Sequence, residues 1–293
     1  MLSGSCVALV TPFRNGLLDT EKLIELVDFH VANKTSGIVP CGTTGESATL
    51  SHEEHERVIE VVVRQARRRV PVIAGAGSNS TSEAVSLTKH AYETGADAVL
   101  SIVPYYNKPT QDGLFAHFST IAKSVPIPMI IYNVPSRTGT NLLPATLLRL
   151  AEKHKNIIGV KESAGSVDQV SDIARQVDTK KFMVLSGDDS LTLPILSVGG
   201  RGVISVLANI APKFTNELCQ AFFKGNLKKA QEMHQKMFPL AKALFIETNP
   251  APVKTAMEMM GLCSAEMRLP MCPISEDTKK TLARELRAFG LLR

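Results

Sequence analysis

A lysine stands near the middle of the chain, at the end of a short apolar run. Residues 157–163 read Ile-Ile-Gly-Val-Lys-Glu-Ser, and the alternation of a strand would place Ile157, Gly159 and Lys161 on one face. Because apolar neighbours make an ammonium ion costly, burial there would favour the neutral amine. A neutral amine can attack a ketone and form an imine. The alternative interpretation is that Lys161 marks a strand running out into solvent, where most lysines lie.

Hydroxyl groups and glycines follow other short apolar runs. Thr43 and Thr44 come after one run, Tyr106 follows another, Tyr132 ends a third and Gly187 follows a fourth. Backbone N–H groups in the glycine-flanked threonine turn could hold a carboxylate. A tyrosine beside the lysine could carry the protons needed to form a carbinolamine and release water. These side chains suit imine chemistry on a keto acid, provided that the fold brings the ends of the runs together.

Eight apolar runs alternate with helical patterns, which predicts a parallel sheet with right-handed crossovers. The predicted strands are 6–10, 37–40, 72–75, 98–103, 129–132, 157–161, 182–186 and 202–206. Eight such units within about 210 residues fit a closed (β/α)8 barrel, in which functional residues lie at the carboxyl ends of the strands. We therefore expect an α/β fold, with a TIM barrel over residues 1–210 and a C-terminal helical extension over residues 211–293. An open doubly wound sheet is the main alternative, but no G-x-G-x-x-G opens the first helix.

Short polar motifs mark the starts of several helices. The predicted capping boxes pair Ser51 with Glu54, Ser80 with Glu83 and Ser166 with Gln169. Asp188 and Asp189 follow the seventh strand and a glycine. We interpret these two acids as helix caps rather than as a catalytic carboxylate pair.

Composition argues against several classes of protein. The 293 residues are 44% hydrophobic and 21% charged, which is enough for a sizeable core, and the net charge of +5 is spread along the chain. Aromatic residues make up 5% and Trp is absent, so nothing indicates a nucleic-acid module. No apolar run reaches the ~20 residues that span a membrane. Five scattered cysteines without a C-x-x-C pair suit free thiols in a reducing cytoplasm. His52 and His55 lie three residues apart, but no H-E-x-x-H motif or third ligand indicates a metal.

Six motifs occur in order over essentially the whole chain. They are Cys-Gly-Thr-Thr-Gly-Glu at 41–46, Tyr-Asn-Val-Pro-Ser-Arg-Thr-Gly at 132–139, Gly-Val-Lys-Glu-Ser at 159–163, Ser-Gly-Asp-Asp at 186–189, Gly-Val-Ile-Ser at 202–205 and Glu-x-Asn-Pro-x-Pro-x-Lys at 247–254. Together they resemble the family of 4-hydroxy-tetrahydrodipicolinate synthase, also called dihydrodipicolinate synthase. The resemblance implies a class I aldolase-type lyase of lysine and diaminopimelate biosynthesis that uses no cofactor. Pyruvate would condense with the lysine, and the resulting enamine would attack the aldehyde of L-aspartate-4-semialdehyde before cyclisation to 4-hydroxy-tetrahydrodipicolinate.

The resemblance also implies roles for individual residues. Lys161 would form the Schiff base and Tyr132 would donate protons, in a relay with Thr43 and with Tyr106 lent by a neighbouring subunit. Substrate contacts would come from Thr44, Arg137, Gly187 and Ile204. Feedback inhibition by L-lysine would use Ser47, Ala48, His52, His55, Asn79, Glu83 and Tyr105. Shared sites also imply a homo-oligomer, with a tetramer built as a dimer of dimers.

Other functions are compatible with such a barrel. A sister class I aldolase, such as N-acetylneuraminate lyase or a 2-keto-3-deoxy sugar acid aldolase, would share the lysine and the tyrosine. Arg137 favours the aspartate semialdehyde reaction, because a guanidinium clamps the carboxylate that this aldehyde carries, whereas sugar acids need hydroxyl contacts. A non-catalytic barrel that only binds a keto acid should lack Lys161 or Tyr132, and both are present. At the lysine site, the alternative is that Glu83 caps a helix and the histidines are ordinary polar residues.

Overall fold

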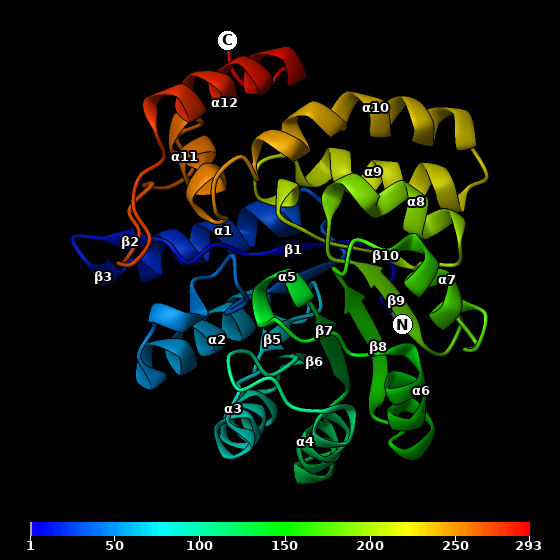
Figure 1. The fold of residues 1–293 in the computed structure, drawn as a ribbon. Coiled ribbons are helices and arrows are strands. Elements are labelled where there is room, and N and C mark those ends of the chain that lie inside the picture. The colour runs from blue at the N-terminus through cyan, green and yellow to red at the C-terminus, as the bar shows by residue number, and fades with distance from the viewer. Residues whose placement is uncertain (1) are drawn as a thin grey trace.

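Eight parallel strands form the centre of the computed structural model, which describes residues 2–293 (Figure 1). The strands are β1 (Gly4–Ala8), β4 (Gly37–Val39), β5 (Ile73–Gly75), β6 (Ala98–Ile102), β7 (Met129–Asn133), β8 (Ile157–Glu162), β9 (Met183–Ser186) and β10 (Gly202–Ser205). Their order is β4-β1-β10-β9-β8-β7-β6-β5, and a parallel bridge between Ile38 and Val72 joins the two ends. The closed (β/α)8 barrel predicted from the sequence is therefore confirmed.

Helices surround the barrel and continue beyond it. They are α1 (Thr20–Ala32), α2 (His52–Ala66), α3 (Thr81–Thr94), α4 (Gln111–Ser124), α5 (Pro135–Thr138), α6 (Pro144–Lys153), α7 (Val167–Ala174), α8 (Thr192–Ser197), α9 (Pro212–Phe223), α10 (Leu227–Ala243), α11 (Ala251–Met259) and α12 (Glu276–Phe289). Helix α9 packs on β1, α10 packs on α9, and α12 contacts both α10 and α11. A short hairpin of β2 (Phe13–Arg14) and β3 (Leu17–Leu18) was not predicted. None of the helices within residues 2–293 is long and apolar enough to cross a membrane.

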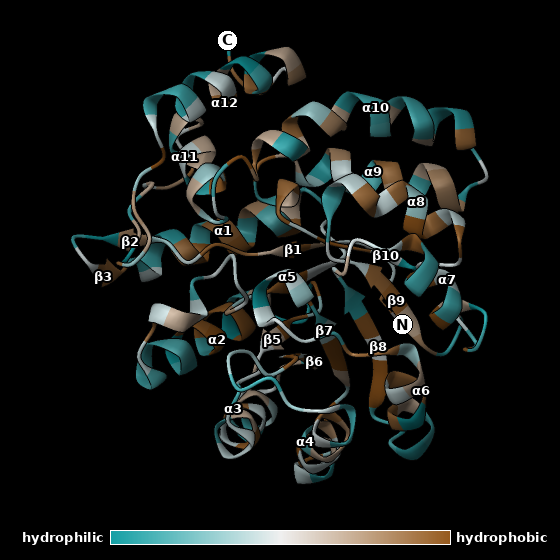
Figure 2. Cartoon of the chain, viewed as in Figure 1, coloured by the Kyte–Doolittle hydropathy of each residue, from teal (hydrophilic) through white to brown (hydrophobic). Residues whose placement is uncertain are grey.

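Two apolar layers hold the barrel together. An inner cluster fills the barrel and consists of Cys6, Ala8, Val39, Ile73, Ala98, Leu100, Ile130, Tyr132, Val134, Met183, Leu185 and Ile204. A larger outer cluster lies between the strands and the helices. Strands buried on both faces read as continuous apolar runs, which is why they stood out in the sequence. In Figure 2, β8 and β9 are brown, and teal residues gather on the surrounding helices.

A bulge in β8 changes which residues share the face of the lysine. Met129 pairs with Ile157 but Ile130 pairs with Gly159, so β8 has one extra residue at this point. As a result Ile157 belongs to the outer cluster, and Ile158 packs against the inner one. The expectation that Ile157 lies on the same face as the lysine is therefore wrong.

Only some of the predicted capping boxes form. Ser51 and Glu54 exchange both hydrogen bonds at the start of α2, with Glu54 N to Ser51 Oγ at 3.2 Å and Ser51 N to Glu54 Oε2 at 3.0 Å. At α3, Ser80 makes no capping bond with its side chain. The Glu83 carboxylate accepts a hydrogen bond from Ser78 Oγ instead. The predicted cap of α3 is therefore wrong, which leaves the Glu83 carboxylate at the surface of the cavity described below.

Candidate active site

A cavity of about 150 Å³ opens where several strands end. Its lining includes Thr43 and Thr44 from the turn after β4, Tyr132 from β7, Lys161 from β8 and Gly187 after β9. Arg137, on the short helix α5, also lines this cavity, so the fold brings these six predicted site residues together. Residues from five separate parts of the sequence therefore meet at the carboxyl end of the barrel, as expected for this fold.

Lys161 and Tyr132 are direct neighbours on adjacent strands. Their Cα atoms are partners in the β7–β8 register, and Lys161 Nζ lies 4.0 Å from the centre of the Tyr132 ring. Lys161 is only 6% exposed, so the interpretation that it runs out into solvent is wrong. Packing against an aromatic face and a closed cavity gives this amine few water contacts, and the phenol is held within reach of anything bound to it.

Gly187 allows β9 to approach β8 beside the lysine. A Cβ atom at this position would lie 1.8 Å from Ser163 Oγ and 3.0 Å from Lys161 Cε. Any side chain would therefore displace one or the other. Ser163 Oγ also lines the cavity and is buried without a hydrogen-bond partner among residues 2–293. The sequence analysis gave Ser163 no role, although it lies two residues after the lysine on the same strand end.

The two acids after β9 make no capping bond at the helix that follows it. Asp188 takes the N-cap position of the 3-10 helix Asp189–Leu191, but its side chain does not cap, so the prediction holds for position only. Asp189 is buried and accepts hydrogen bonds from Val206 N at 3.0 Å and Leu207 N at 2.9 Å, so it fixes the end of β10. Asp188 lines the cavity instead. Burial raises the pKa of the Asp188 carboxyl group, and the nearby cations of Lys161 and Lys242 partly offset this effect. Within residues 2–293, no group of three His, Cys, Asp or Glu side chains is placed to hold a metal ion.

A buried carboxylate links the ends of β7 and β8. Glu162 directly follows the lysine and accepts hydrogen bonds from Asn133 Nδ2 at 3.1 Å, Ala164 N at 2.7 Å and Gln169 Nε2 at 3.1 Å. Burial raises the pKa of Glu162, and these donors oppose the shift. Because Gln169 turns toward Glu162, the predicted box at α7 forms only in half, with Gln169 N bonded to Ser166 Oγ at 3.1 Å. Asn133 follows the tyrosine on β7, so the network ties the two strand ends together.

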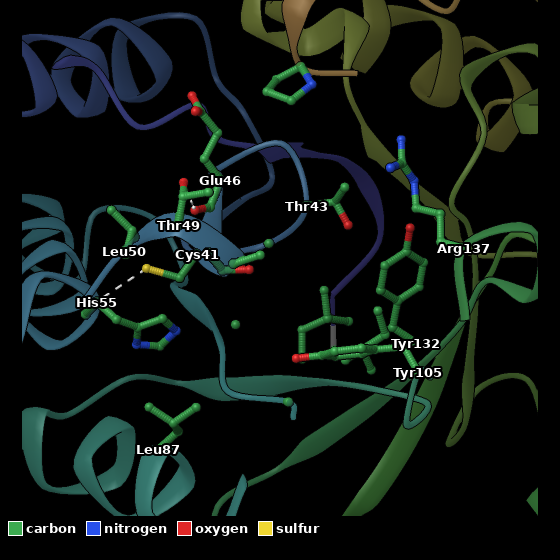
Figure 3. Close-up of a pocket in the computed structure, with 18 of the residues that line it drawn as sticks. Cys41, Thr43, Glu46, Thr49, Leu50, His55, Leu87, Tyr105, Tyr132 and Arg137 are labelled. Carbon is green, nitrogen blue, oxygen red and sulfur yellow. Dashed lines mark hydrogen bonds between the residues drawn. The ribbon is translucent and has the colours of Figure 1, made fainter. Parts of the chain in front are cut away.

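Asn249 connects the threonine turn to the arginine. Its Nδ2 donates to Thr44 Oγ1 at 3.0 Å, and its backbone oxygen accepts from Arg137 Nη2 at 3.4 Å. Its Oδ1 is buried and has no partner within the described part of the chain. Figure 3 draws the larger cavity described below and shows Arg137 and Tyr132 on one side of it, facing Thr43. Asn249 lies within a recognised motif, but the sequence analysis gave it no role in the site.

Two predicted site residues lie apart from this cavity. Ile204 is fully buried in the inner cluster on β10 and does not line the cavity. Tyr106, on the loop after β6, is 89% exposed and points away from its own barrel. Its φ of 72° lies in the left-handed region, which for a bulky residue costs about 1–3 kcal/mol. The chain thus holds an exposed aromatic side chain in a strained backbone conformation.

A second cavity of about 440 Å³ adjoins the first (Figure 3). The residues that line both are Gly42, Thr43, Leu100, Tyr132, Arg137 and Asn249, which we call the common wall. Beyond this wall the larger cavity is lined by most of the predicted lysine-site residues, namely Ser47, Ala48, His52, His55, Glu83 and Tyr105. Asn79 does not line it but donates from Nδ2 to Tyr105 O at 3.1 Å, so it supports that tyrosine.

Polar groups already pair inside the larger cavity. His52 Nε2 lies 3.1 Å from Glu83 Oε1, which links the start of α2 to α3. Burial lowers the pKa of His55 to about 4, with further lowering by the nearby His90 and His52. Near pH 7, His55 is therefore a neutral ring. Glu46 and Glu83 both line this cavity, but Glu46 is already paired with Lys254, which leaves Glu83 as the carboxylate available to a bound cation.

A buried amine beside a phenol, at the carboxyl end of a (β/α)8 barrel, defines a lyase of the class I aldolase type. The chain belongs to the dihydrodipicolinate synthetase family, whose model matches residues 1–289. It is 57% identical over 292 residues to the 4-hydroxy-tetrahydrodipicolinate synthase of Syntrophus aciditrophicus (strain SB), covering 100% of both chains. The fold matches the dihydrodipicolinate synthase of Aquifex aeolicus with a TM-score of 0.97 and 50% identity, over 99% of this chain and 98% of that one. The Cyanidioschyzon merolae enzyme, solved with lysine bound, gives a TM-score of 0.97 at 40% identity over 99% of each chain. The protein is thus an enzyme of lysine and diaminopimelate biosynthesis.

Proposed function

We propose that this enzyme condenses pyruvate with L-aspartate-4-semialdehyde through a Schiff base on Lys161. The observation that carries the proposal is the buried Lys161 amine beside the Tyr132 ring in a cavity at the carboxyl end of the barrel. The amine attacks the ketone carbon of pyruvate, and the carbinolamine loses water to give the imine. Loss of a methyl proton gives the enamine, whose carbon attacks the aldehyde. The amino group of the aldehyde substrate then attacks the imine carbon and displaces the Lys161 amine, and this cyclisation yields 4-hydroxy-tetrahydrodipicolinate.

Protons for these steps come from the phenol. Tyr132 protonates the departing hydroxyl group of the carbinolamine, in a relay with Thr43 and with Tyr106 of a second subunit. Thr44 and Gly187 contact pyruvate, and we assign the backbone N–H groups of the threonine turn to its carboxylate. No cofactor takes part in this scheme. The free, mostly buried thiols of the described chain suit a cytoplasmic location.

A coupled assay tests the proposal directly. Pyruvate and L-aspartate-4-semialdehyde should give product, whereas N-acetylneuraminate or a 2-keto-3-deoxy sugar acid should not be cleaved at a comparable rate. Borohydride with pyruvate should add covalent mass to the protein, and a barrel that only binds a keto acid would stay unmarked. Turnover of a sugar acid above that of aspartate semialdehyde would favour the sister aldolases.

Arg137→Ala should weaken the use of aspartate semialdehyde and leave imine formation with pyruvate largely intact. Arg137 lies at the common wall, where its guanidinium can pair with the carboxylate of the aldehyde. Losing one charge-assisted pair costs about 1.5–3 kcal/mol, or roughly ten- to a hundred-fold in kcat/KM. The measurement is kcat/KM for each substrate, with Arg149→Ala, an exposed arginine on α6, as the control. An unchanged kcat/KM for the aldehyde would remove this role from Arg137.

Subunits with Tyr106→Phe should restore activity to subunits with Lys161→Ala when the two are mixed. We propose a homotetramer built as a dimer of dimers, in which Tyr106 enters the site of a neighbouring subunit. The support is the exposure of this tyrosine and its strained backbone, which a docking partner would compensate. In a mixed dimer one site combines an intact lysine with an intact tyrosine. Sites complete within one subunit would show no recovery, and that result would contradict the shared arrangement.

L-lysine should inhibit the enzyme, and Glu83→Ala should raise the inhibitory concentration at least ten-fold. We propose that lysine occupies the larger cavity, with its ammonium group at Glu83 and its carboxylate near Asn79 and Tyr105. The measurement is the initial rate against lysine concentration. Glu60→Ala is a matched control, because Glu60 pairs with a histidine on α3 but does not line the cavity. A parent enzyme indifferent to millimolar lysine would show that the site does not regulate.

A further inference from the structure

The motif at 247–254 ends in a lysine that the reaction does not use. Lys254, on α11, is 0% exposed. Its Nζ donates to Glu46 Oε1 at 2.7 Å, to Thr11 O at 2.9 Å and to the backbone oxygen of Glu266. These three acceptors take all the protons of an ammonium group, so Lys254 is held as a cation and is not a second nucleophile.

Glu46, the partner of Lys254, ends the turn that carries the two threonines. It is two residues after Thr44 and lies in the left-handed region with φ of 53°. Its second oxygen, Oε2, accepts from Arg268 N at 3.3 Å. Both oxygens of this buried carboxylate are therefore held by segments of the C-terminal extension. The same extension holds the middle of the turn through the hydrogen bond from Asn249 to Thr44.

A buried ion pair is a poor way to gain stability. The cost of removing two charges from water offsets most of their attraction, and an apolar pair of similar volume stabilises a fold as well or better. What an ion pair with four fixed hydrogen bonds adds is geometry, because each bond restricts where the turn can lie. This turn carries Thr43 and Thr44, which line the smaller cavity. Ser47, which follows Glu46 in the sequence, lines the larger cavity.

We propose that the Glu46–Lys254 ion pair is a positioning device through which the C-terminal extension sets the place of the Thr43–Thr44 turn. The extension is then a working part of the catalytic site rather than an appendage to the barrel. This inference rests on the proposed function only in assigning the threonine turn to pyruvate. Neither Glu46 nor Lys254 lines the smaller cavity, although Glu46 lines the larger one, so both act on pyruvate through the turn.

The test uses variants that leave no unpaired charge in the protein interior. In Glu46→Gln/Lys254→Met both charges are removed together, which avoids leaving one ion buried alone. We expect this variant to fold, with parent-like circular dichroism, and to trap pyruvate with borohydride ten- to a hundred-fold more slowly, because small misplacements of binding groups cost rates of this order. Glu46→Asp keeps the charge and shortens the side chain by one carbon. It should fold and slow trapping about ten-fold, which keeps the proposal testable if the double variant is unstable.

A matched control is available on the same extension. Asp277 and Lys280 form another ion pair of the extension, on α12, and neither lines either cavity. Asp277→Asn/Lys280→Met should trap pyruvate at the parental rate. Trapping at that rate by the folded Glu46→Gln/Lys254→Met or Glu46→Asp variant would overturn the proposal and leave the pair a purely structural role.

Hydrogen exchange separates this proposal from the proposed function. The backbone amides of residues 42–50 should exchange at least ten-fold faster in Glu46→Gln/Lys254→Met than in the parent, and at the parental rate in the control. If the parent itself fails to trap pyruvate, the proposed function fails, and exchange alone decides the role of the ion pair. Unchanged exchange in this segment would contradict the positioning role whatever the substrate.

Discussion

Lys161→Ala should abolish covalent trapping of pyruvate by borohydride. The imine requires a primary amine as nucleophile, and Lys161 is buried at the cavity beside Tyr132. Lys161→Arg should fail equally, because a guanidinium stays protonated and cannot form the imine. The measurement is the mass of the protein after treatment with pyruvate and borohydride. We expect the parent to gain one reduced pyruvyl group per chain and both variants to gain none.

The second buried lysine makes this experiment discriminating. If Lys161→Ala still gained pyruvate, Lys254 would be the next residue to consider. Burial lowers the pKa of Lys254, and the Glu46 carboxylate opposes this shift. All three protons of its ammonium group are engaged in hydrogen bonds, one of them to Glu46, so the amine is not free to attack a ketone. Persistent labelling in Lys161→Ala would therefore contradict the Schiff-base assignment, and peptide mapping would identify the lysine that replaces it.

Tyr132→Phe should lower kcat by about 10²–10⁴-fold while leaving the fold intact. The substitution removes one oxygen from a side chain whose ring packs in the inner cluster, so packing is kept. General acid–base catalysis by a positioned group contributes about 10²–10⁴-fold, and the Tyr132 ring centre lies 4.0 Å from the amine. The measurement is kcat for the condensation, together with the rate of imine trapping.

The outcome for imine trapping shows where the phenol acts. Trapping should slow along with kcat, because the same group assists the loss of water from the carbinolamine. Tyr92→Phe, at an exposed position on α3, is the control and should behave like the parent. A fall in kcat of less than ten-fold in Tyr132→Phe would mean that another group carries the proton.

The barrel was predictable because its strands are buried on both faces. Such strands read as uninterrupted apolar runs, and helices between them carry apolar stripes. The bulge at Ile158 was not predictable, since it depends on how β8 pairs with β7 and leaves no mark in the local pattern. The cap at Ser80 was mispredicted for a related reason. Its proposed partner Glu83 has a nearer donor in Ser78 and a histidine on α2, and sequence spacing cannot rank these competitors.

Those residues of the candidate site that lie at the carboxyl ends of strands could be predicted from the sequence. Lys161, Tyr132 and Gly187 were placed at the carboxyl ends of their strands by the order of elements alone. Asn249 was missed because it reaches the threonine turn across more than 200 residues of sequence, through contacts that only the folded extension creates. Asp189 was misread as a cap because the donors that it binds, on the end of β10, lie in the next unit of the barrel. The roles of the site residues stay predictions until the experiments above are done.

Because the two cavities share the common wall, an elongated molecule that passed along this wall would occupy both. One end would carry a keto acid to the amine of Lys161, and the other an ammonium group to Glu83, with a linker passing Thr43 and Arg137. Once one end is bound, the other is held at a high effective concentration, so such a bivalent inhibitor could exceed the affinity of either half by about 10²–10⁴-fold. A substitution in the protein that weakens binding at one cavity would then leave the inhibitor bound through its other end.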